Sequence, residues 1–449
     1  MASLTEGTAK LIRDLAGVSL AEEAIYRSKI GVMDCVGVAL AGTGEPVGGI
    51  MLDYARSMTL RGEATVWGTA DKVSAAEAAL VNGTLAHALD YDDVNRSVLG
   101  HPSAVLAPAL FAVTEKLALP GRKLLEAYVV GLEVMGRIGR IFGPPAYGKS
   151  WHPTSILGVL GACAGSSYLL RLSYEQTLNA IGIAASEASG IKKNFGSMTK
   201  PLHAGSAARK GVWAALLAEK GLTANPQSLD GVYGFMEMFY GKPYDADAMN
   251  DLARPLEILD SGLGFKQYPC CGGLASVVDN MISLKQQRKI TPATVTEIEC
   301  QVHPSRITYL DRADVNEGLE AKFSIQYCAA TALLDGELGL NHFLEESVRR
   351  PETQAVMKKV RITPREDLGG FGSKVIVRTV NGDQFSSVQT ESKGSPAFPL
   401  SEREMLAKFV DCAKITLSPA RAEQAGQAFM SLEKAPSLDA IGKLLAADA

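Results

Sequence analysis

The feature that most constrains the fold is a series of Ala- and Gly-rich segments in the first 265 residues, apolar on nearly every side. Three of them are "EAALVNGTLAHALDYDD", "SAVLAPALFAVTEKLAL" and "LLEAYVVGLEVMGRIGRIFG", separated by short segments that contain Pro or Gly. Helices that are apolar nearly all round should be buried against one another. Small residues, as in "GVLGACAGSS", let backbones approach closely. This part of the chain is therefore predicted to be a helical domain.

Capping patterns place the starts of several helices. Ser19 with Glu22, Ser173 with Gln176 and Ser401 with Glu404 have the spacing of a capping box. In that motif the hydroxyl and the acidic or amide side chain satisfy backbone N–H groups that the first turn leaves unpaired. Helices are predicted directly after each pair.

The pattern changes near residue 270. "TVTEIECQVH" alternates like a strand, "KKVRITP" is a second candidate, and "SKVIVRTVNGDQFSSVQTE" predicts a hairpin at Asn381-Gly382. Helices are expected between the strands, at "GLASVVDNMISLKQQ" and "NEGLEAKFSIQYCAATALLDG". We therefore predict a mainly α fold, with a helical domain of 1–267 and 395–449 and an α+β domain of 268–394. A chain of 449 residues is long enough for such a division.

Charge and composition exclude several classes of partner. The net charge is −4 and the pI about 6.0, so no overall basic field exists to hold nucleic acid or an anionic membrane. No apolar run of about 18 residues occurs, and the N-terminus lacks the pattern of a signal peptide. Seven scattered cysteines without a CxxC indicate reduced thiols and a cytoplasmic protein.

The common cofactor motifs are missing from the sequence. It contains neither GxGxxG nor GxxxxGK[ST], no GxSxG, and six histidines without HExxH or close ligand spacing. We predict neither an organic cofactor nor a metal.

Two polar clusters interrupt the apolar helical region. "HALDYDDVNRSVLGHPS" follows a helix, and "AYGKSWHPTS" precedes one. Ordinary alternatives are a solvated acidic loop at a helix end for the first and a plain N-terminal loop for the second. The candidate functional side chains are His87, Asp90, Asp92, Asp93 and His101 in the first cluster and Tyr147, Lys149, Trp151, His152 and Thr154 in the second.

A third cluster is the basic stretch "NFGSMTKPLHAGSAARKG". Lys200 precedes Pro201 and is expected to be extended, just before a helix whose N-terminus would favour an anion. His203 lies one turn further on, and Arg209 follows. The alternative is a solvated basic helix, which the Gly, Ser and Ala context disfavours. The cluster is predicted to hold a carboxylate.

The region after residue 264 adds weaker candidates. Lys266, in "GFKQYPCCGG", lies at the predicted domain junction, where ligands often bind, although it could be a linker lysine. Arg306 could pair with a carboxylate, and Tyr327 lies in an apolar helix that is more typical of a core.

Together these clusters resemble the MmgE/PrpD family over nearly the whole chain. The shared motifs are "LDYDD…GHPS", "WHPT", "TKPLHAGSAARKG", "GFKQYPCC", "FSIQY" and "GSPAFPLSEREMLAKF". The resemblance implies a large helical domain, a smaller α+β lid domain and a homodimer. It also implies proton transfer next to a carboxylate of a small polycarboxylate substrate, without metal or organic cofactor. Known activities include 2-methylcitrate dehydratase, cis-aconitate decarboxylase and iminodisuccinate epimerase.

The resemblance also implies site residues. Positions that line a decarboxylase-like active site are Asp90, His101, His152, Lys200, Lys266 and Tyr327. However, Val94 stands where decarboxylase-like members carry Thr, and the loop to His101 is about one residue longer, which argues against decarboxylation. The 2-methylcitrate dehydratases are generally longer. Tyr147 and Lys200 look like the acid/base pair proposed for the epimerase.

The resulting hypothesis is epimerisation of an iminodisuccinate-like dicarboxylate. Its catalytic residues would be Lys200, Tyr147, His152, His101 and Asp90, and its substrate-binding residues Lys266, His203, Arg209, Tyr327 and Asp93. Fixed cations would lower the barrier by stabilising the charge that builds up next to a carboxylate. The alternatives are a lyase of the dehydratase or decarboxylase type and a polycarboxylate-binding protein without catalysis.

Overall fold

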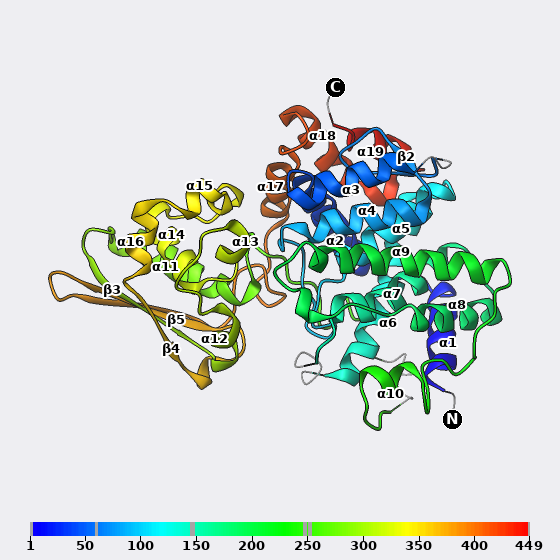
Figure 1. Cartoon of the computed structure of the whole chain (residues 1–449). Coiled ribbons are helices and arrows are strands. Elements are labelled where there is room, and N and C mark those ends of the chain that lie inside the picture. The colour runs from blue at the N-terminus through cyan, green and yellow to red at the C-terminus, as the bar shows by residue number, and fades with distance from the viewer. Residues whose placement is uncertain (1–2, 59–61, 144–148, 246–248, 250–253, 448–449) are drawn as a thin grey trace. The chain divides into compact units, whose positions relative to one another are not determined.

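The computed structural model describes residues 3–58, 62–143, 149–245, 249 and 254–447, which form two compact units. The first unit comprises residues 1–263 and 401–449, and the second comprises residues 264–400. The sequence-based division was 1–267 with 395–449 and 268–394. Figure 1 shows that coiled ribbons dominate, so the predicted mainly α class is confirmed.

The first unit is built almost entirely of helices. Its helices are α1 (Leu4–Ala16), α2 (Glu22–Gly42), α3 (Pro46–Ser57), α4 (Ala75–Ala88), α5 (Ser103–Lys116), α6 (Gly121–Phe142), α7 (Pro153–Leu169), α8 (Tyr174–Ser186), α9 (Thr199–Glu219), α10 (Phe235–Phe239), α17 (Glu402–Ala413), α18 (Pro419–Met430) and α19 (Asp439–Leu444). The prediction of purely helical structure misses one small element, the antiparallel pair β1 (Ala64–Thr65) and β2 (Lys72–Val73).

The segments that are apolar on every side lie in the core, as predicted. Helices α4, α5 and α6, which contain the three quoted segments, and α7 are buried along most of their lengths. The capping boxes at Ser173 and Ser401 are confirmed. The one predicted at Ser19 is wrong, because α2 begins at Glu22 after Ala21, which makes no side-chain cap.

Glycines let α9 lie directly against α4 and α7. A Cβ atom on Gly205 of α9 would lie 2.1 Å from the carbonyl oxygen of Leu80 in α4. One on Gly211 would lie 2.4 Å from Cβ of Ala162 in α7. The register that sets Gly205 beside Leu80 also brings the C-terminal end of α4 next to the N-terminal end of α9.

The second unit is α+β. A four-stranded sheet has the order β4 (Val360–Pro364), β3 (Val295–Val302), β5 (Ser373–Thr379), β6 (Gln384–Gln389), with β3 parallel to β4 and antiparallel to β5. The predicted β5–β6 hairpin is confirmed, with Gly382 at a φ of 81° in its turn. Its helices are α11 (Ala275–Arg288), α12 (Pro304–Leu310), α13 (Gly318–Ala321), α14 (Ile325–Asp335), α15 (Glu345–Val348) and α16 (Pro351–Met357).

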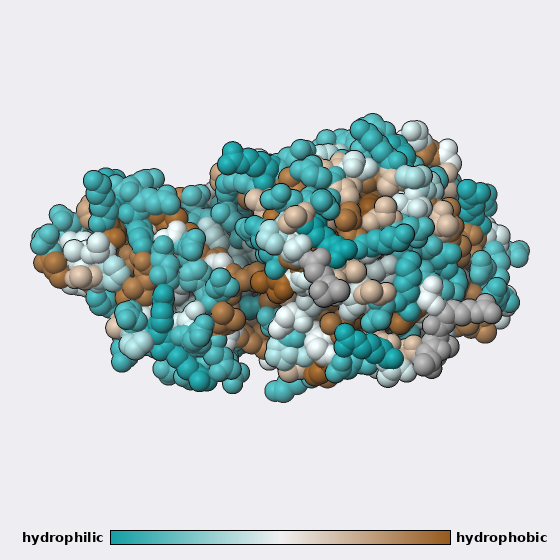
Figure 2. All heavy atoms as spheres, turned by 90° about the horizontal axis from the view of Figure 1, so that it is seen from above, coloured by the Kyte–Doolittle hydropathy of each residue, from teal (hydrophilic) through white to brown (hydrophobic). Residues whose placement is uncertain are grey.

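The surface is polar where it is visible. On the face seen in Figure 2, hydrophilic side chains drawn in teal surround smaller apolar patches. Among the described residues no single helix is long and apolar enough to cross a membrane; α2 and α3 meet that test only as a pair, with a 93° bend between them.

Candidate active site

The acidic turn after α4 is buried, which excludes the solvated-loop alternative. Asp90, Asp92 and Asp93 are each at most 5% exposed. Asp90 has a φ of 53°, a left-handed conformation that aspartate adopts more readily than most residues. Lys408 of α17 also contacts this turn. Its Nζ atom donates to the carbonyl oxygen of Tyr91 at 3.0 Å and lies 2.7 Å from Oδ1 of Asp34.

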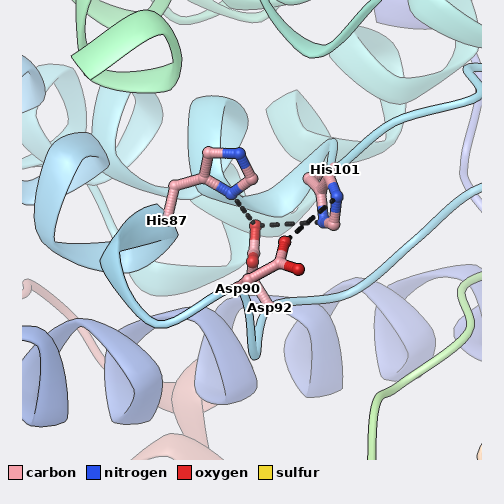
Figure 3. Close-up of side chains that lie close together, drawn as sticks. All are labelled: His87, Asp90, Asp92 and His101. Atoms are coloured by element: carbon pink, nitrogen blue, oxygen red, sulfur yellow. Dashed lines mark hydrogen bonds and ion pairs between the residues drawn. The ribbon is translucent and has the colours of Figure 1, made fainter. Parts of the chain in front are cut away.

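Two histidines share one carboxylate in this turn. Figure 3 shows the rings of His87 and His101 on either side of the carboxylates of Asp90 and Asp92. Oδ2 of Asp92 lies 2.8 Å from Nδ1 of His87 and 3.3 Å from Nδ1 of His101. His87 comes from the last turn of α4, and His101 from the segment just before α5.

Lys200 joins this group from α9. Its Nζ atom donates to Oδ1 of Asp90 at 2.7 Å and lies 5.5 Å from the ring centre of Phe195. The predicted extended conformation of Lys200 is wrong, since α9 begins at Thr199. Pro201 is tolerated there because the first N–H groups of a helix have no intrahelical partner.

His152 and His203 form the next pair. His152 precedes the first residue of α7 and stacks on His87 with ring centres 5.7 Å apart, while His203 lies on α9. Their Nδ1 atoms are 3.3 Å apart, so one nitrogen donates and the other accepts. Asp90, His101, His152, Lys200 and His203, five of the predicted site residues, therefore lie in one cluster within the first unit.

Burial keeps three of the histidines neutral. It lowers the pKa of His87 to about 4, and it lowers the pKa of His152 well below its ordinary value. Burial and then the charge of Lys200 lower the pKa of His203. The ammonium of Lys200 is thus a fixed cation among imidazoles that carry no charge at neutral pH.

Four of these side chains could also hold a metal ion. One ligand atom from each of His87, Asp90, Asp92 and His101 lies within 4.8 Å of the others. Lys200 is already 2.7 Å from Oδ1 of Asp90, so a divalent cation would have to displace the ammonium or bind against its charge.

Two predicted substrate-binding residues of the first unit have other partners. Arg209 is 46% exposed at its side chain and pairs with Glu77 at 2.8 Å, so it holds α9 to α4 instead of joining the cluster. Asp93 has no exposed surface and accepts from the backbone N–H and the hydroxyl of Ser103 at 3.1 and 2.6 Å. Tyr147 lies outside the described residues.

The candidates of the second unit are buried there. Lys266 is 7% exposed. Tyr327 lies in the hydrophobic core of that unit and donates its hydroxyl to the carbonyl oxygen of His342; burial raises its pKa to about 12. Arg306 donates to the carbonyl oxygens of Gly273 and Gly372, so it binds backbone and not the carboxylate that the sequence suggested.

His87 and Asp92 belong to the first quoted cluster of candidates, but the epimerase hypothesis gave neither of them a role. The signal that could have assigned one is the helix itself: His87 ends the apolar stretch of α4, where a buried polar side chain needs a partner. Asp92 supplies that partner five residues later.

The wild-type protein is expected to lose stability as the pH rises because of Asp93, and Asp93→Asn should not show this loss. Burial raises the pKa of Asp93 to about 8, from 3.8 for an ordinary aspartate. The folded protein therefore binds this proton more tightly than the unfolded chain, and stability is lost as the pH rises through that range. Asparagine cannot titrate. Urea unfolding between about pH 5 and pH 9 measures the free energy of unfolding of both proteins. The value for the variant minus the value for the wild-type protein should increase with pH until about pH 8. A difference that does not change with pH would contradict this assignment.

The comparisons with known proteins cover almost the whole chain. Residues 6–246 match the MmgE/PrpD N-terminal domain, and residues 268–434 match the MmgE/PrpD C-terminal domain. The chain belongs to the MmgE/PrpD family. The predicted family is therefore confirmed, and its N-terminal domain contains the cluster just described.

Relatives that match this chain include cis-aconitate decarboxylases. The chain is 32% identical over 424 residues to the enzymes of Mus musculus and Homo sapiens, covering 91% of this chain and 86% and 87% of theirs. It is 24% identical over 463 residues to the cis-aconitate decarboxylase of Aspergillus terreus. These names agree with the lyase alternative and not with the epimerase that the sequence analysis put first.

Proposed function

We propose that this protein is a lyase that decarboxylates a small, unsaturated tricarboxylate of the cis-aconitate type. The observation that carries the proposal is its 32% identity, over 91% of the chain, to two cis-aconitate decarboxylases. Support also comes from the cluster of Asp90, His101, His152 and Lys200, all four of which the family resemblance implied as site residues.

The chemistry of such a substrate fits the groups in the cluster. When CO2 leaves a CH2–COO⁻ group beside a C=C bond, the electron pair of the broken C–C bond shifts through the double bond. It comes to rest on the carbon next to the second carboxylate, where a proton is added. A fixed cation stabilises the charge that builds up there. In this proposal Lys200 supplies the cation, and His101 supplies the proton.

The neutral histidines would have a different part. Because burial lowers the pKa values of His152 and His203, these rings do not add positive charge. They would instead orient substrate carboxylates through N–H donors. Lys200 would have to exchange its contact with Asp90, in whole or in part, for one with the substrate.

Epimerisation of an iminodisuccinate-like acid is the second candidate. Val94 stands where decarboxylase-like members carry Thr, which is the observation that favours it. Both reactions pass through negative charge on a carbon next to a carboxylate, so the same cation serves either one.

Proton NMR in D2O separates the candidates. The purified protein is incubated with cis-aconitate, citrate, 2-methylcitrate and the stereoisomers of iminodisuccinate. The expected result is a new vinyl signal with release of CO2 from cis-aconitate and one deuteron incorporated per turnover. Interconverted stereoisomers with α-deuterium and no alkene would instead establish the epimerase. Binding without turnover of any acid would favour the non-catalytic binding protein. The homodimer and the cytoplasmic location stay predictions.

A further inference from the structure

His87 and Asp92 are close to the proposed site but have no surface through which to touch a substrate. The side chains of both are fully buried, whereas the side chain of His101 is 14% exposed. These two residues can therefore act on a reaction only through their neighbours: Asp92 contacts His101, and His87 contacts Asp92 and stacks on His152. The shared Asp92 oxygen, 2.8 Å from one ring and 3.3 Å from the other, links His87 to His101.

The carboxylate of Asp92 fixes where the imidazole protons are. Its Oδ2 atom lies 2.8 Å from Nδ1 of His87 and 3.3 Å from Nδ1 of His101. An ionised carboxylate only accepts hydrogen bonds. The Nδ1 atom of His87 must then carry the hydrogen of their hydrogen bond, and the same carboxylate, 3.3 Å from Nδ1 of His101, favours a hydrogen on that nitrogen of the neutral ring as well. The Nε2 atom of neutral His101 is left with a lone pair.

The free nitrogen of His101 faces the charged pair of the site. Nε2 of His101 lies 3.8 Å from Oδ1 of Asp90, the oxygen that Lys200 contacts at 2.7 Å. Protonation of His101 would thus place the exchangeable proton on Nε2, beside Lys200. Deprotonation would return a lone pair to the same atom.

We propose that Asp92 and His87 are positioning residues, which together hold His101 so that its Nε2 atom transfers the proton of the reaction. This inference rests on the proposed function, because it needs proton transfer at the site. Asp92 selects the tautomer and orientation of the His101 ring. His87 donates to the same carboxylate and holds it in place.

The test compares Asp92→Asn with the wild-type protein by kinetics and by histidine nitrogen NMR. An amide can donate to Nδ1, so His101 should change from the Nδ1–H to the Nε2–H tautomer. We expect kcat to fall about 10²- to 10⁴-fold, the range for a misoriented catalytic histidine, with KM changed by less than about threefold. Nitrogen-15 spectra of the folded proteins report the tautomer directly, and the His101→Gln and His87→Gln spectra assign the signals.

Asp93→Asn is the matched control. It makes the same chemical change at the next residue, in an equally buried carboxyl that contacts Ser103 and no histidine. Because its pKa of about 8 keeps Asp93 mostly protonated at neutral pH, asparagine resembles it there. The control should keep the wild-type histidine spectrum and kcat.

The outcomes test the positioning role of Asp92 and His87 separately from the proposed function. A changed His101 tautomer together with a large loss of kcat, both absent from Asp93→Asn, supports the inference. An unchanged tautomer in Asp92→Asn overturns it, and so does a changed tautomer with unchanged kcat. The spectra need no substrate. If the wild-type protein converts none of the acids tested, the proposed function fails, and the spectra still decide whether Asp92 sets the His101 tautomer.

Discussion

Lys200→Met is expected to lower kcat strongly and to destabilise the protein. The ammonium of Lys200 is paired at 2.7 Å with Asp90, whose side chain is 8% exposed, and it is the fixed cation of the cluster. Removing one partner of a buried ion pair leaves the other charge uncompensated, which costs about 3–5 kcal/mol. Loss of a group that stabilises developing negative charge lowers kcat by about 10²- to 10³-fold or more. Steady-state kinetics on the acid identified above and urea unfolding measure the two effects.

Two further variants separate the effect on catalysis from the effect on stability. Lys210→Met removes a lysine from the same helix whose amine contacts the carbonyl oxygen of Glu187 and the hydroxyl of Ser189 near the surface, and it should change kcat little. Asp90→Asn combined with Lys200→Met removes both charges, so stability should largely recover while kcat stays low. If Lys200→Met kept wild-type kcat, Lys200 would have no part in the chemistry.

Gly205→Ala is expected to be the most damaging small substitution in α9. The new Cβ would lie 2.1 Å from the carbonyl oxygen of Leu80 and 2.8 Å from the backbone nitrogen of Thr84. Neither backbone atom can move without moving α4, so the cost should reach or exceed the upper part of the usual range for overpacking, about 3 kcal/mol. Separation of α4 from α9 would also pull Asp90 away from Lys200. Thermal or urea unfolding and kcat should therefore both decline.

Gly49→Ala is the matched control for this prediction. Gly49 also lies within a helix, α3, but a Cβ atom there would have no atom within 4 Å. Alanine is the better helix former, so this variant should be more stable by about 0.5–1 kcal/mol. Equal effects of the two substitutions on the free energy of unfolding would contradict the close contact between α4 and α9.

Much of the fold could be predicted because its signals are local. Apolar residues on every side of α4, α5 and α7 required burial, and Asn381-Gly382 between alternating segments required a hairpin. The failures were also local. The pre-proline rule placed Lys200 in an extended conformation, but the first turn of α9 tolerates the following proline.

The candidate site could also be predicted only in part. Its motifs identified Asp90, His101, His152 and Lys200, whereas Arg209 and Asp93 were assigned to substrate binding and have structural partners instead. A motif shows that a residue is basic or acidic, but it does not show which side chain that residue contacts in the fold. Glu77, which neutralises Arg209, lies on another helix.

By itself the sequence determined the mainly α class, the family, and the residue types that the site contains. Periodicity, caps and turns act over a few residues, so they can be recognised without the fold. Only the tertiary structure decided that Lys200 meets Asp90 across 110 positions of the chain, and that Asp92 joins His87 to His101. It also decided the charges, because a pKa depends on burial and on neighbours from other helices, neither of which is encoded in any short stretch of sequence.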